Sequence, residues 1–148
     1  MNHSNHRLND LVAIARDGKG FYEHAATKVN DPELKALFNR IASIKGEVVA
    51  GLSSQIKAAG EKPADSGTLV GDISKLYGEL RALAGNKDYA YVAQLEQSED
   101  RLLHAFEEAR NDKDVSPAAL VVLDRLAPEI RQCHDLMRTR KQALKKAA

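Results

Sequence analysis

The stretch "AGNKD", residues 84–88, decides how the helices of this chain are connected. It separates two segments with apolar residues at helical spacing, residues 68–84 and residues 89–110. Without the break, one helix over residues 68–110 would be about 64 Å long, and its overhang would expose an apolar stripe unless a second subunit covered it. With the break, residues 68–84 form a shorter crossover helix, and the next helix runs parallel to the one before the crossover. Glycine and asparagine at this point favour the crossover.

Three further helices follow from the same apolar spacing on either side of this stretch. They are predicted over about residues 8–29, 32–59 and 117–145. The last two each begin with a capping side chain followed by proline, at Asp31-Pro32 and Ser116-Pro117. No segment alternates with period two, so the fold class is all-α: a four-helix bundle with an extra shorter helix at about 68–84. We expect residues 1–148 to form one domain, with residues 1–6 and about 142–148 flexible.

The composition narrows the range of partners. Of the 148 residues, 43% are hydrophobic and 29% are charged, and the net charge is +1, so no bulk field favours a nucleic acid. No apolar run approaches the ~20 residues of a membrane span, and the polar N-terminus lacks the apolar core of a signal peptide. The one cysteine, Cys133, cannot form an internal disulfide. These features predict a cytoplasmic protein that binds neither membranes nor nucleic acids.

One carboxylate is out of place in the helical pattern. In the segment 93–109, Glu99 points into the middle of the apolar stripe. An ionised carboxylate there is costly unless it is paired or binds a cation. Lys45 occupies a similar position in the helix over residues 32–59, and His134 lies at the edge of the last helix's stripe. We therefore predict an internal polar cluster of Glu99 with Lys45 or His134, joined by Tyr22.

The alternative leaves both charged residues outside the core. Lys45 would extend along the apolar surface to bring its ammonium group into solvent, and Glu99 would lie near a groove or an oligomer interface. The pattern of apolar residues is compatible with either arrangement. A third possibility is that Glu99 helps to hold a metal ion or a ligand.

Five motifs in order give the chain a family resemblance. They are "DGKGFYEHA", "DPELKALF", "SGTLVGDISKLYGELRALAGNKD", "EQSEDRLLHAFEEA" and "CHD". From about Leu8 to Arg140 the chain resembles an uncharacterised bacterial four-helix-bundle family, a domain of unknown function grouped by fold with the ferritin-like proteins. The resemblance implies a ferritin-like fold and no particular activity.

The di-iron site of ferritin-like proteins has a recognisable ligand pattern, which this chain lacks. Such sites take a Glu-x-x-His pair from each of two helices and a further Glu from each of the other two. The chain contains no Glu-x-x-His. We therefore expect no metal cofactor. The alternative is a degenerate iron or manganese site among Glu23, Glu96, Glu99 and His134.

A second possible metal site lies at the N-terminus. With histidine third in the chain, the terminal amine, two backbone amides and the His3 imidazole could form a square-planar Cu(II) or Ni(II) site. A tail that binds no metal is the expected alternative.

The sequence contains no phosphate-binding loop and no nucleophile motif. It therefore favours a non-enzymatic or accessory bundle that acts by self-association, as a homodimer, or by binding a protein partner. The alternative function is a metal-binding or redox protein with the degenerate carboxylate and histidine site.

Overall fold

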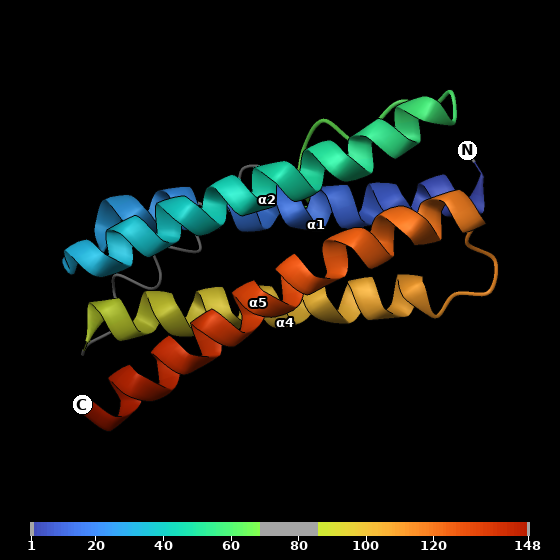
Figure 1. Ribbon diagram of the computed structural model, residues 1–148. Helices are drawn as coiled ribbons and strands as arrows, with labels where there is room; N and C mark the ends of the chain where they lie inside the picture. Colours follow the sequence, from blue (N-terminus) through green and yellow to red (C-terminus); the bar gives the residue numbers. More distant parts are fainter. Residues whose placement is uncertain (1, 69–85, 148) are drawn as a thin grey trace.

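The computed structural model describes residues 2–68 and 86–147, which form four α-helices and no β-strand. The helices are α1 (His3–Lys28), α2 (Pro32–Ala58), α4 (Lys87–Arg110) and α5 (Pro117–Ala147). Figure 1 shows α1 beside α2 and α4 beside α5, each pair antiparallel, and the two pairs pack together. The predicted all-α class is confirmed.

Side chains at the helix ends explain where the helices begin. Asp31 and Asn86 act as N-caps, accepting hydrogen bonds from the backbone N–H groups of Glu33 and Tyr89. The first helix starts at His3 and not near Leu8, because the Asn2 side chain accepts from the N–H of Asn5 at 2.8 Å and caps an additional polar turn.

The chain turns back after α2 and follows α1. The side chain of Asn9 accepts a hydrogen bond from the N–H of Ala64, and the Arg16 Nε donates to the carbonyl of Ala64. Further on, the hydroxyl of Thr68 bonds to the carboxylate of Asp17. Residues later in this loop therefore contact residues later in α1, so the loop travels towards the end of the bundle where α2 began.

Helix α4 starts at that same end. Asp88, in the first turn of α4, accepts hydrogen bonds from the N–H groups of Asn30 and Asp31 in the turn between α1 and α2. As a result α4 runs parallel to α2 (Figure 1). The alternative of a single helix over residues 68–110 is therefore wrong, because Asn86 caps the start of a separate helix, α4. The predicted shorter helix at about 68–84 lies, apart from Thr68, outside the described residues.

The core consists of two apolar clusters placed one after the other along the bundle. Both take residues from all four helices. One includes Leu8, Leu52, Phe106 and Leu123, and the other includes Phe38, Leu95 and Met137. Between them lies a layer in which α2 and α4 contribute charged residues.

No helix in the described part of the chain combines the length and the apolar character needed to cross a bilayer.

Candidate functional site

A buried polar cluster joins α1, α2 and α4 between the two apolar clusters. Tyr22 donates a hydrogen bond from its hydroxyl to the Glu99 carboxylate at 2.7 Å, and the Lys45 Nζ donates to the same carboxylate at 2.8 Å. Each of the three residues is at most 1% exposed. The structure thus brings together three of the four residues expected in the polar cluster.

The contacts in this cluster compensate the negative charge of the buried Glu99 carboxylate. Glu99 and Lys45 neutralise each other, and the Tyr22 hydroxyl satisfies a further acceptor position on Glu99. A buried pair persists only when its charges are matched and hydrogen-bonded in this way. The ammonium group therefore occupies the position, next to an inward-facing carboxylate, where a bound cation would have to lie.

Cys133 of α5 lies close enough to this cluster for its charges to affect the pKa of the thiol. Burial raises the pKa of the Cys133 thiol to about 11, while the charges of Lys45 and Glu99 act on it in opposite directions. At neutral pH the thiol is therefore protonated and a weak nucleophile. Cys133 is a core residue, as its place in the apolar cluster indicates.

The fourth residue of the expected cluster, His134, faces elsewhere. Its Nε2 lies 2.5 Å from Asp100 Oδ1 of α4, and its Nδ1 lies 3.1 Å from Asp135 Oδ1. Burial lowers the pKa of His134, but the hydrogen bonds to Asp135 and Asp100 outweigh it, so the pKa is raised above the usual 6.5. Asp100 follows Glu99 by one residue, about 100° around the helix, and so leaves the core for the seam between α4 and α5.

Two acidic residues of α4 meet His134 in this seam. Glu96, Asp100 and His134 each offer one ligand atom, and these atoms all lie within 4.8 Å of one another. Glu96 is partly buried and its carboxylate also lies 3.5 Å from the Lys141 Nζ. Glu96 and Asp100 are four residues apart, which places them on one face of α4.

The structure does not bring together the four residues of the alternative iron or manganese site. Glu96 and His134 are neighbours, but Glu99 is held by Lys45 and Tyr22 in the core. Glu23 lies on the surface, where its carboxylate accepts from the Lys19 Nζ at 2.7 Å.

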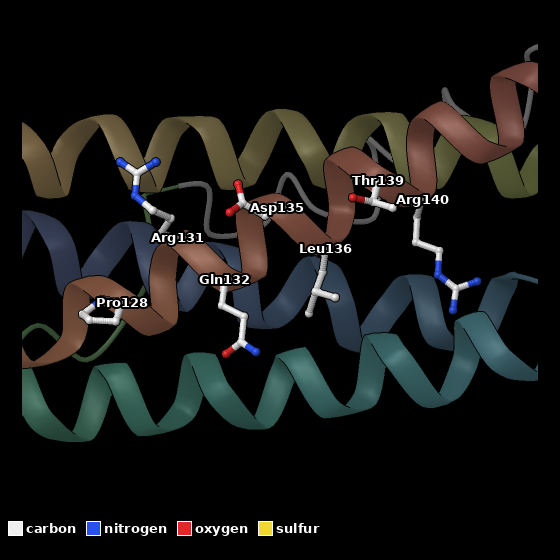
Figure 2. A pocket seen from close by; sticks show the side chains of 7 residues that line it. All are labelled: Pro128, Arg131, Gln132, Asp135, Leu136, Thr139 and Arg140. Carbon is white, nitrogen blue, oxygen red and sulfur yellow. The ribbon is translucent and has the colours of Figure 1, made fainter.

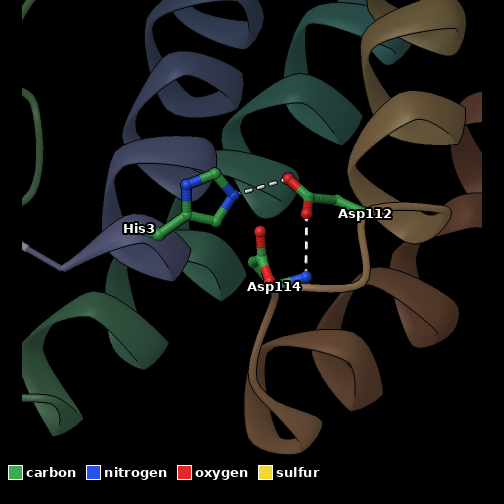
Figure 3. A group of neighbouring side chains, drawn as sticks. All are labelled: His3, Asp112 and Asp114. Atoms are coloured by element: carbon green, nitrogen blue, oxygen red, sulfur yellow. Dashed lines mark hydrogen bonds and ion pairs between the residues drawn. The ribbon is translucent and has the colours of Figure 1, made fainter.

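His3 lies in a second group, just beyond the C-terminal end of α4. Its Nε2 is 2.6 Å from Asp112 Oδ2, and Asp112 also accepts from the N–H of Asp114 (Figure 3). The Arg7 Nε donates a further hydrogen bond to Asp112. These hydrogen bonds, that of His3 first, hold the pKa of Asp112 well below its usual range. Ligand atoms of His3, Asp112 and Asp114 also lie within 4.8 Å of one another.

A surface groove of about 460 Å³ lies along α5. Figure 2 shows the side chains of Gln132, Leu136 and Arg140 extending towards α2, while Arg131 and Asp135 extend towards α4. Pro128 and Thr139 complete the lining. Both arginines also take part in ion pairs, with Glu107 and Glu33 respectively.

The sequence alone did not predict which residues contact His134 and His3. Asp100 and Asp135 stand in the motifs "EQSED" and "CHD", and the spacing of Glu96 and Asp100 marks one helix face. What the residues alone lack is the register of α4 against α5, which decides whether that face meets His134. Asp112 lies in a loop, so no periodic pattern indicated its contact with His3.

The similarity of this chain to known proteins is at the level of a family. No curated protein and no solved structure matches it. A family model matches residues 4–112, which include Tyr22, Lys45 and Glu99 but not His134. Because this match covers most of the chain, the protein belongs to the family described as Domain of unknown function (DUF2383).

Proposed function

We propose that this protein is a non-enzymatic, accessory ferritin-like bundle that acts through its surface, on a protein partner or on a second copy of itself. The parallel course of α2 and α4 supports the ferritin-like assignment, because it is the topology of bundles with a long crossover connection. A bacterial cytoplasm is the proposed location, in keeping with the single buried thiol of Cys133.

The observation that carries the proposal is the pairing of Glu99 inside the core. Its carboxylate already binds an ammonium group and a phenol hydroxyl, and all three side chains are buried. Such a cluster holds three helices together and leaves Glu99 committed to internal contacts. We therefore infer that the core stabilises the fold and that the protein acts through its surface.

Metal analysis of protein purified without a metal-affinity tag tests whether the core binds iron or manganese. We expect no stoichiometric iron or manganese, and we expect the same content for Glu99→Ala. About two iron or manganese ions per chain, lost in Glu99→Ala, would overturn the proposal and support the alternative function, a metal-binding or redox protein.

The groove on α5 supports the surface role, since its lining combines the apolar side chains of Leu136 and Pro128 with charged side chains. Chemical cross-linking in cells and light scattering of the purified protein test it together. We expect Leu136→Asp to lose a cross-linked partner or a second copy that the wild type retains. Val121→Asp is the matched control, because Val121 is an apolar residue on the same helix, 67% exposed, and outside the groove. Equal cross-linking and equal mass in all three proteins would contradict a role for this groove.

A further inference from the structure

The seam between α4 and α5 contains a set of side chains that neither the family description nor the proposed function uses. Glu96 and Asp100 project from one face of α4 towards His134 of α5, and the three ligand atoms lie within 4.8 Å of one another. We propose that Glu96, Asp100 and His134 bind a single divalent transition-metal ion, with zinc as the best-fitting ion. This goes beyond the proposed function, because the site is distinct from the core cluster around Glu99.

The donor set favours zinc over the common hard cations. One imidazole nitrogen with two carboxylate oxygens is a mixed set of the kind that zinc accepts, whereas calcium and magnesium prefer oxygen ligands alone. Three protein ligands leave the fourth tetrahedral position open to water. Asp100 is exposed, so an ion can reach the site from solvent, while His134 is 8% exposed and lies at its inner wall.

The surroundings of His134 suit a metal ligand. Asp135, outside the ligand set, lies 3.1 Å from the His134 Nδ1. A carboxylate at one ring nitrogen fixes the orientation of the imidazole and directs the other nitrogen towards the metal. Here that other nitrogen, Nε2, faces Asp100 at 2.5 Å.

The local charge also favours a cation. Glu96, Asp100 and Asp135 bring three carboxylates to this seam, and Lys141 is the ammonium group that pairs with one of them, at 3.5 Å from Glu96. With a neutral imidazole, one ammonium leaves the group with a net charge of about −2, which a divalent ion would balance.

Calorimetric titration of the full chain with zinc chloride tests the proposal. We expect one zinc ion per chain, and we expect Asp100→Asn to weaken the affinity by about tenfold or more. Asp135→Asn should weaken it by about tenfold through loss of ring orientation. Asp100 is exposed and its replacement nearly isosteric, so folding is preserved, and circular dichroism of each variant verifies this.

The group of His3, Asp112 and Asp114 requires a matched control, since it offers a similar donor set. Asp114→Asn removes one of those ligands and should leave zinc binding unchanged. If Asp100→Asn binds zinc as tightly as the wild type, or if Asp114→Asn is the variant that loses it, the proposal is wrong. The outcome is separate from the test of the core, because the zinc ion should be retained in Glu99→Ala.

Discussion

At the scale of single residues, the pair of Lys45 and Glu99 gives the sharpest test of how the core is held. Replacing either residue alone leaves the other as an uncompensated buried charge, so Lys45→Met or Glu99→Leu should destabilise by about 3–5 kcal/mol. The double variant should recover much of that loss, because both charges are removed together. Denaturant unfolding of the four proteins measures the coupling. Small additive effects, under about 0.5 kcal/mol each, would show that the pair does not form.

A second residue-scale prediction concerns pH and Asp112. Its hydrogen bonds to His3, Asp114 and Arg7 favour the ionised form, so its pKa in the fold lies below the usual value near 3.8. A carboxyl group with a depressed pKa stabilises the fold above its unfolded pKa, and this stabilisation is lost as the pH falls below it. Asp112→Asn should therefore be less stable than the wild type at neutral pH, and the difference should shrink below about pH 4.

Urea unfolding at a series of pH values measures this difference. Asp114→Asn is the control, because Asp114 contributes its backbone N–H to Asp112, which the substitution retains. A gap between wild type and Asp112→Asn that stays constant down to acid pH would contradict the assignment.

Residues on the apolar stripes were predictable because one helix suffices to define them. Glu99 and Lys45 each stand at the centre of a stripe, so their burial followed from periodicity. His134 stands at the edge of its stripe, where a small rotation decides between core and seam. Its contact with Asp100 depends on how α4 and α5 are aligned, and no single-helix pattern contains that information.

At the scale of the elements, the return loop after α2 depends on a close contact at Gly67. A Cβ at this position would lie 2.0 Å from Asp17 Oδ1 and 3.2 Å from the carbonyl oxygen of Ala13. Gly67→Ala should therefore push the loop away from α1 and weaken the contacts that Asp17 makes with Thr68 and Arg101, destabilising the protein by about 1–3 kcal/mol. Thermal or urea unfolding measures the loss.

Gly46, inside α2, provides the comparison. A Cβ there would lie 3.4 Å from the end of the flexible Lys19 side chain, which can move aside. Gly46→Ala should be neutral or stabilising by up to about 1 kcal/mol, because alanine favours the helix. Similar losses in both variants would mean that the fit of Gly67 against α1 is unimportant.

Helix starts differ in how well the residues reveal them. Asp31-Pro32 is a strong signal, and α2 begins where it predicts. The cap at Asn2 precedes a turn with no apolar periodicity, so the first turn of α1 was not predicted. Pro128 lies inside α5, which continues through it to Ala147.

At the scale of the whole molecule, the direction of α4 decides whether one chain can bury its own core. Because α4 starts beside the turn between α1 and α2, it lies along the other helices and has no overhang. The break at Gly85-Asn86 predicted this direction, since a helix that stops there can be followed by one parallel to α2. The contacts that hold the return loop against α1, such as the hydrogen bond between Ala64 and Asn9, could not be predicted from the sequence.

A chain that closes its own core should fold without a second copy. Each of the two apolar clusters draws on all four helices, and Val121 is the one large apolar residue that is exposed in the described part of the chain. The midpoint of denaturant unfolding should therefore be independent of protein concentration as long as the folded chains are monomeric, because association through the groove on α5 would itself raise the midpoint. In an obligate dimer, association stabilises the folded state by mass action, and the midpoint rises with concentration. A rising midpoint that persists in Leu136→Asp would show that part of the core is completed by a partner chain, whereas a rise that Leu136→Asp abolishes would show association through the groove.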